Sequence, residues 1–304
     1  MTSRTLLIDG NSIGYASQHA MKLTAGTMET QAIYGFVKTM RELRTIYPGH
    51  KPMVLWDGRA QWRFDIHPDY KSNREDNPTK VKVKEAYAEQ KPYIFRCLEH
   101  LGIRQMTVMT HEADDMAGYF VTEMSKKNPS GEIVLITGDG DWKQLVRKGV
   151  TWRDLRSDDR IVTSKTFLDK TGYATPFAFL EGKCLQGDTS DCIPGVGGIG
   201  EKGAPEFLAE FGSVRNFWAK VDSGELKLKK KAHINLASKE GRAAFARNFR
   251  LMQLMRVPAP KREDTRLVLG KYDQEKFAEV CEEVAFTSVL TTIDHFTQPF
   301  KDMS

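Results

Sequence analysis

Acidic residues that could bind metal ions recur along this chain of 304 residues, and several of them directly follow short apolar runs. Asp9 follows residues 6–8, Asp57 follows residues 53–56, and Asp139 follows residues 133–137 and a glycine. Apolar runs of this length, ended by Asp or Gly, indicate buried parallel strands. Because the carboxyl ends of parallel strands meet at one edge of a sheet, we expect the acidic side chains to converge there. The candidates are Asp9, Asp57, Glu112, Asp114, Asp115, Asp139, Asp141, Asp188 and Asp191.

A cluster of that many carboxylates would need cations. Like charges raise one another's pKa, so closely spaced carboxylates cannot all ionise unless a cation neutralises them. Oxygen ligands without neighbouring His or Cys favour Mg²⁺ or Mn²⁺ over zinc. Two such ions could activate a water molecule and stabilise the oxygens of a phosphoryl group.

Each acidic group also has an ordinary structural interpretation. An Asp after a strand can cap a helix or begin a turn, and residues 112–115 can oppose a helix dipole. A calcium loop is excluded, because the residue spacing of an EF-hand is absent. We favour the metal site because the acidic groups up to residue 141 all fall at the same predicted edge of the sheet.

The elements expected around these residues indicate an α/β fold, with a mainly parallel central sheet flanked by helices. Residues 30–47 have apolar side chains at helical spacing, and a further strand at 106–109 precedes a helix from 113 to about 126. We divide the chain into an α/β body, residues 1–172, a helical region, residues 173–296, and a frayed tail, residues 297–304. Residues 70–93 are polar and lack an apolar stripe, which is typical of a mobile loop or of a helix held away from the core.

A glycine cluster occupies residues 195–200, with the sequence Gly-Val-Gly-Gly-Ile-Gly. It does not follow a buried strand, as a dinucleotide-binding loop must, and Glu201 stands where a Walker loop has its lysine. A tight hairpin between two short helices, residues 176–186 and 201–211, fits better. Backbone amides there could hold a phosphate without reading a base, and Lys202 would add positive charge. The alternative is a flexible loop that binds nothing.

Charge and composition narrow the class of protein. The net charge is only +5, but residues 215–266 carry 14 Lys and Arg against 5 Asp and Glu, so the rest of the chain is slightly acidic. Such a basic region suggests a polyanionic partner such as nucleic acid, although the Lys-rich residues 227–231 alone could be a solvated surface. No apolar run suits a membrane helix, and four widely spaced cysteines argue against disulfides or a zinc site. We therefore expect a soluble cytoplasmic protein.

In their order along the chain, these stretches resemble the flap endonuclease/5′-3′ exonuclease family, most closely the stand-alone bacteriophage 5′-nucleases and the nuclease domain of bacterial DNA polymerases. The resemblance covers about residues 4–260. It is carried by residues 8–11, 56–58, 70–74, 112–115, 137–142, 186–191 and 193–200.

The resemblance implies a PIN-like 5′-nuclease fold, with a helical arch at residues 70–93 and a helix-hairpin-helix type C-terminal region whose glycine hairpin spans residues 193–204. It implies that the nine acidic residues hold two or more Mg²⁺ or Mn²⁺ ions. Lys71 and Arg74 match basic catalytic residues at the foot of the arch, which contact the scissile phosphate. Tyr70 matches an aromatic residue that stacks on a terminal base. The residues that would bind duplex backbone are Gly195, Gly197, Gly198, Gly200 and Lys202, with K⁺ held by carbonyls of the hairpin.

The implied activity is structure-selective, divalent-metal-dependent hydrolysis of phosphodiesters, by an enzyme that is both a 5′-3′ exonuclease and a flap endonuclease in DNA replication. The expected partner is DNA with 5′ ends, flaps or single-strand/duplex junctions, and RNA–DNA primers are a further substrate class. We expect a monomer with no membrane partner, located in the host cytoplasm if the protein is viral. Two alternatives stay open: an RNA-primer-removing ribonuclease of the same fold, and a catalytically inactive protein that binds DNA structures.

Overall fold

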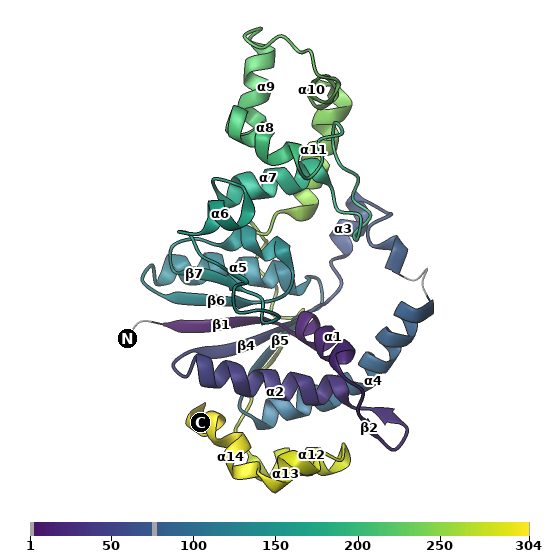
Figure 1. The fold of residues 1–304 in the computed structure, drawn as a ribbon, viewed down its shortest axis with the longest axis vertical. Coiled ribbons are helices and arrows are strands. Elements are labelled where there is room, and N and C mark those ends of the chain that lie inside the picture. Colours follow the sequence, from purple (N-terminus) through teal and green to yellow (C-terminus); the bar gives the residue numbers. More distant parts are fainter. Residues whose placement is uncertain (1–2, 75–77, 304) are drawn as a thin grey trace.

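A mostly parallel β-sheet forms the centre of the molecule (Figure 1). The computed structural model describes residues 3–74 and 78–303. Within these residues the sheet has seven strands in the order β8-β7-β6-β1-β4-β5-β9. The predicted α/β class is therefore confirmed. The parallel strands are β7 (Val150–Arg153), β6 (Glu132–Ile136), β1 (Arg4–Asp9), β4 (Lys51–Trp56) and β5 (Arg104–Val108), and the antiparallel edge strands are β8 (Ile161–Val162) and β9 (Thr265–Val268).

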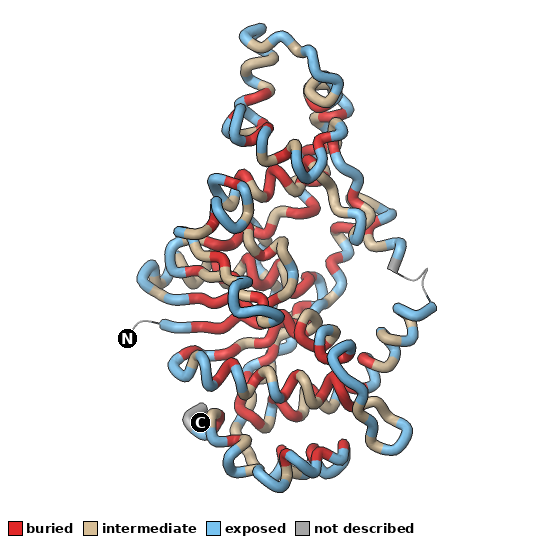
Figure 2. The backbone as a smooth tube through the Cα atoms, viewed as in Figure 1, coloured by how far each residue is buried: buried red, intermediate tan, exposed pale blue. Residues whose placement is uncertain are grey.

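The central strands are buried on both faces, which explains their continuous apolar sequences. Leu7 of β1 belongs to one apolar core, whereas its neighbours Leu6 and Ile8 belong to a second core. Successive side chains of a strand point to opposite faces, so a sheet covered on both sides needs apolar residues at every position. Figure 2 shows the buried residues concentrated along these strands and the helices packed against them.

Helices cover both faces of the sheet. One core includes side chains from α1 (Gly10–Ala20), α2 (Gln31–Ile46) and α4 (Pro78–His100), and a short hairpin of β2 (Thr24–Ala25) and β3 (Met28–Glu29) connects the first two of these helices. The other core includes α5 (Ala113–Lys127) and the 3-10 helix η2 (Gly140–Leu145). The helices predicted at residues 30–47 and 113–126 are thus α2 and α5. No helix in the described ranges combines the length and apolar character needed to cross a membrane.

A helical region extends beyond one side of the body (Figure 1). It consists of α6 (Phe167–Thr171), α7 (Pro176–Gln186), α8 (Gly203–Phe211), α9 (Val214–Asp222), α10 (Lys231–Ala237) and α11 (Lys239–Met252). Helix α7 begins after Thr175, whose side chain accepts a hydrogen bond from the amide of Ala178. The predicted helix pair around the glycine cluster is therefore present as α7 and α8. Gly197 and Gly198 have φ angles of +71° and +79°, which glycine adopts without the steric cost of a Cβ atom.

The chain returns to the α/β body after α11, which differs from the predicted division at residues 173–296. Strand β9 pairs with β5, and α12 (Gln274–Glu283), α13 (Thr287–Thr291) and α14 (Ile293–Thr297) add to the core formed by α2 and α4. The predicted frayed tail is also wrong. Phe300 in the 3-10 helix η3 (Gln298–Met303) is fully buried, and Arg44 Nε donates a hydrogen bond to the carbonyl of Pro299 at 3.1 Å.

Most of the polar segment at residues 70–93 is helical. A 3-10 helix, η1 (Ser72–Arg74), follows α3 (Gln61–Ile66), and α4 begins at Pro78. Residues 78–86 of α4 are exposed or half-buried, whereas Tyr87 and Ile94 are buried. The first turns of α4 therefore stand away from the core, as one of the two sequence-based interpretations expected. Residues 75–77 of the predicted arch lie outside the described residues.

Candidate functional site

The ends of three parallel strands bring acidic residues to one edge of the sheet. Asp9 ends β1, Asp57 follows β4, and Asp139 comes three residues after the end of β6. Burial, together with the negative charge of Asp57, raises the pKa of Asp9 to about 6. Desolvation and the charges of Asp141 and Asp9 raise the pKa of Asp139 to about 7. The predicted convergence of these side chains is thus visible in their mutual electrostatic effects.

Asp9 and Asp139 also cap the helices that follow them. Asp9 accepts hydrogen bonds from the amide of Ser12 at 2.9 Å and from Thr137 Oγ1 at 2.8 Å. Asp139 accepts one from the amide of Asp141 at 2.8 Å, and its own amide donates to Thr137 Oγ1 at 2.9 Å. Asp9 and Asp139 therefore act as helix caps and also lie at the sheet edge, because the capping bonds fix the positions of the two carboxylates. Thr137, which sequence reasoning did not single out, connects them.

Asp57 connects two helix starts. It accepts hydrogen bonds from Asn11 Nδ2 at 2.7 Å and from the amide of Ala113 at 2.8 Å. These bonds join β4 to the first turns of α1 and α5. The Asp57 side chain itself remains exposed.

Glu112 and Asp114 at the start of α5 have different partners. Glu112 caps the helix and accepts hydrogen bonds from the Tyr70 hydroxyl at 3.0 Å and from Lys71 Nζ at 2.6 Å. Asp114 accepts one from Trp142 Nε1 at 2.6 Å. Burial and the surrounding carboxylates raise the pKa of Asp114 well above its usual range.

Asp115 is paired with Arg63, a residue that sequence reasoning missed. Arg63 Nη1 and Nη2 donate to the two carboxylate oxygens at 2.7 and 2.6 Å, and the amide of Glu112 donates to Asp115 at 2.9 Å. Arg63 Nε also donates to the carbonyl of Leu251 at 3.0 Å. The environment of Asp115 thus differs from that of Asp114, because strong donors already satisfy both of its oxygens. An arginine between Trp62 and Phe64, shortly after Asp57, was the available sequence signal.

The later acidic residues lie around Lys183 of α7, which sequence reasoning also missed. Lys183 Nζ is 3.0 Å from Asp141 Oδ1 and 3.4 Å from Asp188 Oδ2. Burial raises the pKa of Asp141 despite this cation. For Asp188, burial is outweighed by hydrogen bonds from Ser190 and by the charge of Lys183, so its pKa is lowered. The available sequence signal was that Lys183 lies in the last turn of the predicted helix, five residues before Asp188.

The foot of the arch is hydrogen-bonded to the acidic loop at residues 188–192. The amide of Lys71 donates to the carbonyl of Asp191 at 3.1 Å, and His67 Nε2 lies 2.7 Å from the carbonyl of Cys192. Lys71 and Cys192 have φ angles of +58° and +57°, which are uncommon for residues with a Cβ atom. The arch foot and the acidic loop therefore form one connected unit.

The predicted substrate-binding residues at the arch foot are only partly accessible. The Lys71 ammonium contacts Glu112, as described above. Tyr70 is 3% exposed, and its ring packs edge-on against Phe64 at a centroid distance of 5.4 Å, so the ring is not open to a base in this arrangement. Arg74 ends η1, and its side chain lies outside the described residues. The catalytic roles of Lys71 and Arg74 and base stacking by Tyr70 stay predictions.

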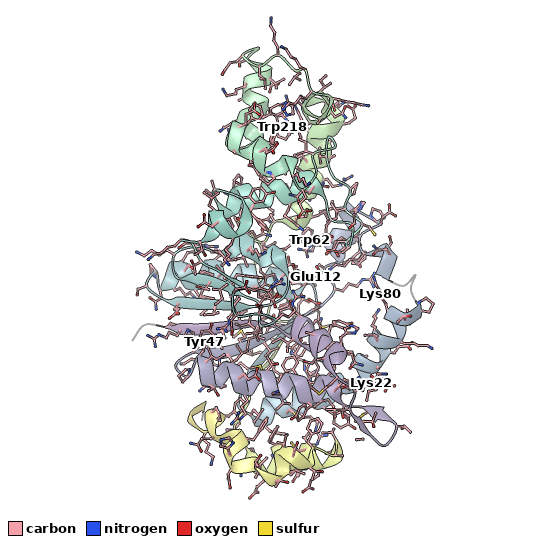
Figure 3. All side chains as sticks on the ribbon, viewed as in Figure 1. Lys22, Tyr47, Trp62, Lys80, Glu112 and Trp218 are labelled. Atoms are coloured by element: carbon pink, nitrogen blue, oxygen red, sulfur yellow. The ribbon has the colours of Figure 1, made fainter. Side chains whose placement is uncertain are left out.

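A recess between the body and the helical region collects most of these groups. Figure 3 shows Glu112 at the centre of the molecule, between the sheet and Trp62, with Lys80 of α4 to its right. In the part of the chain that the structure describes, no three Asp, Glu, His or Cys side chains are already arranged around one point as the ligands of a single ion would be. The acidic groups are gathered in one region, but cationic side chains stand between several of them. The recess is lined by Arg63, Tyr70, Glu112, Asp114, Asp141, Asp188 and Asp191, with apolar Ile193, Leu251, Met252 and Leu254.

The chemistry of this region fits hard divalent cations. Its potential ligands are carboxylate oxygens, which Mg²⁺ and Mn²⁺ prefer. Burial, and after it repulsion from neighbouring carboxylates, raises the pKa values of Asp9, Asp114 and Asp139, and a bound cation would relieve this repulsion.

The glycines of the hairpin differ in the space that surrounds them. A Cβ atom on Gly198 or Gly200 would meet no atom within 4 Å, whereas one on Gly195 or Gly197 would collide with a backbone carbonyl of the neighbouring helices. Gly195, Gly198, Gly200 and Lys202 are exposed, and Gly197 is half-buried. The backbone of the hairpin is therefore accessible at most of the predicted positions, while Gly195 and Gly197 also leave no room for a side chain.

Two family models describe nearly the whole chain. Residues 4–172 match the N-terminal resolvase-like domain of the 5′-3′ exonucleases, and residues 174–275 match their C-terminal SAM fold. The chain is 33% identical over 254 residues to DNA polymerase I of Lactococcus lactis subsp. lactis and 31% identical over 290 residues to that of Mycobacterium bovis. These alignments cover 78% and 92% of this chain but only 27% and 30% of the polymerases.

Solved structures share the fold over nearly the full length. The zinc-bound 5′-exonuclease of bacteriophage T5 aligns with a TM-score of 0.70 at 23% identity and covers 99% of both chains. The T5 flap endonuclease, in a pseudo-enzyme-product complex with DNA and metal ions, aligns with a TM-score of 0.69 at 23% identity, covering 99% of this chain and 98% of that one. The catalytic core of Rad2 in complex with DNA substrate aligns at 0.61 and 17% identity, covering 98% and 93%. The expected 5′-nuclease fold is confirmed, and with both of its domains matched the chain belongs to the 5′-3′ exonuclease family.

Proposed function

We propose that the protein is a structure-selective 5′ nuclease that depends on divalent cations and hydrolyses DNA phosphodiesters near 5′ ends and single-strand/duplex junctions. The observation that carries this proposal is that acidic residues from the start of α5, from η2 and from the loop after α7 line one recess beside the foot of the arch. The strand-end residues Asp9 and Asp57 lie close enough to influence Asp114 of this recess. Family membership supports it, as do the divalent ions and the DNA present in structures of the T5 enzyme.

We assign the cations to eight of the nine predicted carboxylates. They are Asp9, Asp57, Glu112, Asp114, Asp139, Asp141, Asp188 and Asp191. Asp115 is assigned to holding Arg63, because both of its oxygens already accept hydrogen bonds from that guanidinium. Bound at this region, Mg²⁺ or Mn²⁺ ions would supply Lewis acidity toward the phosphoryl oxygens and the attacking water.

Basic side chains around the recess would neutralise the substrate. Lys71 is held beside Glu112 by its own backbone bond to Asp191, so its ammonium is positioned where a phosphate would enter the recess. Arg63 is fixed by its pairing with Asp115 and supplies permanent positive charge next to Glu112, at 3.3 Å. Charge developing on the phosphate would then meet preorganised donors rather than water.

Duplex DNA would be held outside the recess. Gly198, Gly200 and Lys202 form an exposed patch at the helix pair α7–α8, and the basic residues 215–266 follow along the chain. Contacts of this kind recognise backbone rather than sequence and weaken as salt rises. A K⁺ ion at the carbonyls of the hairpin and a role in DNA replication belong to this proposal as predictions.

One assay tests the proposal and its alternatives together. The protein is incubated with a labelled 5′-flap DNA, an RNA-primed duplex and a plain single strand, each with Mg²⁺ or with a chelator. We expect Mg²⁺-dependent cleavage of the flap DNA close to the junction. Cleavage restricted to the RNA-primed duplex would identify a ribonuclease, and tight flap binding without any cleavage would identify an inactive DNA-structure binder.

A further inference from the structure

A groove lies at the end of the sheet opposite to the acidic recess. One part of it is a cavity of about 400 Å³ where the first residues of β1, β4 and β5 meet α5. Because a strand rises about 3.3 Å per residue, the length of β1 separates this cavity from Asp9 by roughly 15 Å. In Figure 1 the start of β1 lies at the left edge of the molecule, while α3 and α4 lie on the right.

A second cavity, of about 600 Å³, adjoins the first along the outer face of α5. It lies between that helix and residues 255–259, which lead the chain from the helical region back to the sheet. Tyr119 and Glu123 line both cavities, so the two spaces form one groove. Each cavity is large enough to accept one or more side chains of another molecule.

The floor of the groove is apolar. Met53, Tyr119, Phe120 and Met124 line it, and all four are half-buried against the core of the body. Methionine side chains adapt their shape to different ligands, and aromatic rings provide large contact areas at interfaces. The floor can therefore receive apolar side chains of a partner.

The walls of the groove are basic. Lys51, Arg104 and Arg256 are exposed and form no ion pair with any residue in the described ranges, and Lys127 is exposed beside them. The single acidic residue of the groove, Glu123, already pairs with Lys126 at 2.9 Å. The groove therefore combines apolar cavities with unneutralised positive charge.

We propose that this groove binds an acidic segment of a partner protein. Apolar side chains of the segment would enter the two cavities, and its Asp and Glu residues would face Lys51, Arg104 and Arg256. A DNA backbone would use the positive charge but not the apolar floor, whereas an acidic peptide with aromatic or aliphatic anchors uses both. Charge complementarity of this kind favours rapid and selective association.

Binding at this groove leaves the recess accessible. The groove is built from the amino ends of the strands, and the acidic residues lie beyond their carboxyl ends. A partner bound there would hold the enzyme without blocking DNA, so that recruitment and cleavage are separate properties of the molecule.

A peptide selection tests this inference. The 304-residue chain is used to select from a library of random peptides of about twelve residues, which reach about 40 Å when extended. The charge-reversed variant Lys51→Glu/Arg104→Glu serves as the comparison, and Lys22→Glu/Lys165→Glu, which reverses two exposed lysines elsewhere, is the matched control. We expect the selected peptides to be rich in Asp and Glu with Phe, Leu or similar anchors.

Binding of a selected peptide, followed by fluorescence anisotropy, should weaken by about tenfold or more in Lys51→Glu/Arg104→Glu and stay unchanged in the control. Cleavage of 5′-flap DNA by the charge-reversed variant should equal that of the wild type. Selected peptides without acidic residues, or equal peptide binding by both variants, would overturn the inference. It would also be overturned if duplex DNA displaced the peptide and the charge reversal weakened duplex binding by the same factor, since the groove would then be a DNA surface.

Discussion

Arg63, which lines the acidic recess, forms a buried ion pair with Asp115 through two parallel hydrogen bonds of 2.7 and 2.6 Å. Arg63 is 2% exposed and Asp115 is completely buried. Burial desolvates both groups, and the pair is stable because the Arg63 guanidinium and the Asp115 carboxylate compensate each other's charge. Removing one partner of such a pair leaves a buried charge without compensation, which costs about 3–5 kcal/mol.

The neighbouring residues Asp115 and Asp114 should respond in opposite ways to the same substitution. Asp115→Asn removes the carboxylate that holds both Nη atoms of Arg63, leaving Glu112 at 3.3 Å as its remaining counter-charge, and should lower the free energy of unfolding by about 3 kcal/mol. Asp114→Asn removes a carboxylate whose pKa is raised by burial and by neighbouring carboxylates, so it should leave stability unchanged or increase it in metal-free buffer at pH 8. Urea unfolding of both variants measures the difference. Equal losses of stability would contradict the separate roles that we assign to the two residues.

Lys183 should neutralise part of the negative charge of Asp141 and Asp188 when no metal ion is bound. In Lys183→Met, Asp141 and Asp188 lose the ammonium at 3.0 and 3.4 Å, so metal-free stability should fall by about 1–2 kcal/mol. Mg²⁺ should then restore more stability to this variant than it adds to the wild type, because a ligand that binds the folded state stabilises it. Thermal unfolding with and without Mg²⁺ measures both effects, with exposed Lys148→Met as the control. An identical Mg²⁺ response in all three proteins would argue against cation binding near Asp141.

His67 should position the foot of the arch. Its Nε2 lies 2.7 Å from the carbonyl of Cys192, and since a carbonyl only accepts, this nitrogen must carry the proton. His67→Ala should lower the single-turnover rate on flap DNA by about tenfold with little change in DNA affinity, and His67→Gln, which keeps a donor, should restore much of the rate. A loss confined to affinity, or no rescue by glutamine, would contradict the positioning role.

Stability should fall as pH rises because of Glu181, which is 3% exposed on α7. Its Oε1 accepts a hydrogen bond from the amide of Val214, while Oε2 has no partner within the described structure. Burial raises the pKa of this carboxyl from 4.5 to about 7, so the folded protein binds the proton more tightly than the unfolded chain does. The stabilising contribution of the proton is complete below pH 4.5 and is lost as pH rises to about 7.

Glu181→Gln should therefore match the wild type near pH 4.5 and be more stable by up to about 3 kcal/mol at pH 8. Unfolding by urea across this pH range measures the difference, and Glu210→Gln on the exposed side of α8 is the control. A difference between Glu181→Gln and the wild type that does not change with pH would exclude this carboxyl as the source.

The sequence made the strand-end carboxylates predictable because their placement follows from a local rule. Apolar runs buried on both faces identify parallel strands, and an Asp after each strand must lie at the carboxyl edge of the sheet. For this reason Asp9 and Asp57 lie close enough to affect each other's ionisation. The helices α2, α5 and α7 were also predictable from local sequence. Apolar spacing indicates helices, and Thr175 and Pro176 mark the start of α7.

The cationic side chains of the recess were not predictable in this way. Arg63 meets Asp115 across 52 positions of sequence, and no local pattern indicates such a pairing. Tyr70 was expected to face a base, yet its hydroxyl lies on Glu112, 42 positions away. Phe300 was assigned to a frayed tail because short terminal segments carry no periodic signal, whereas the apolar core of α2 and α4 buries it. Long-range packing decided each of these positions.

The most direct test of the central claim is single-turnover cleavage of a 5′-flap DNA by the wild type and by Asp9→Asn in Mg²⁺. Asparagine keeps an oxygen that can accept the hydrogen bond from the Ser12 amide, as Asp9 Oδ1 does, but it replaces the Oδ2 that accepts from Thr137 and removes the charge that a cation needs. We predict cleavage close to the junction by the wild type, a loss of about a thousandfold or more in Asp9→Asn, and flap affinity within a few-fold of the wild type. Near-normal cleavage by Asp9→Asn, or cleavage by the wild type that persists in a chelator, would contradict the account.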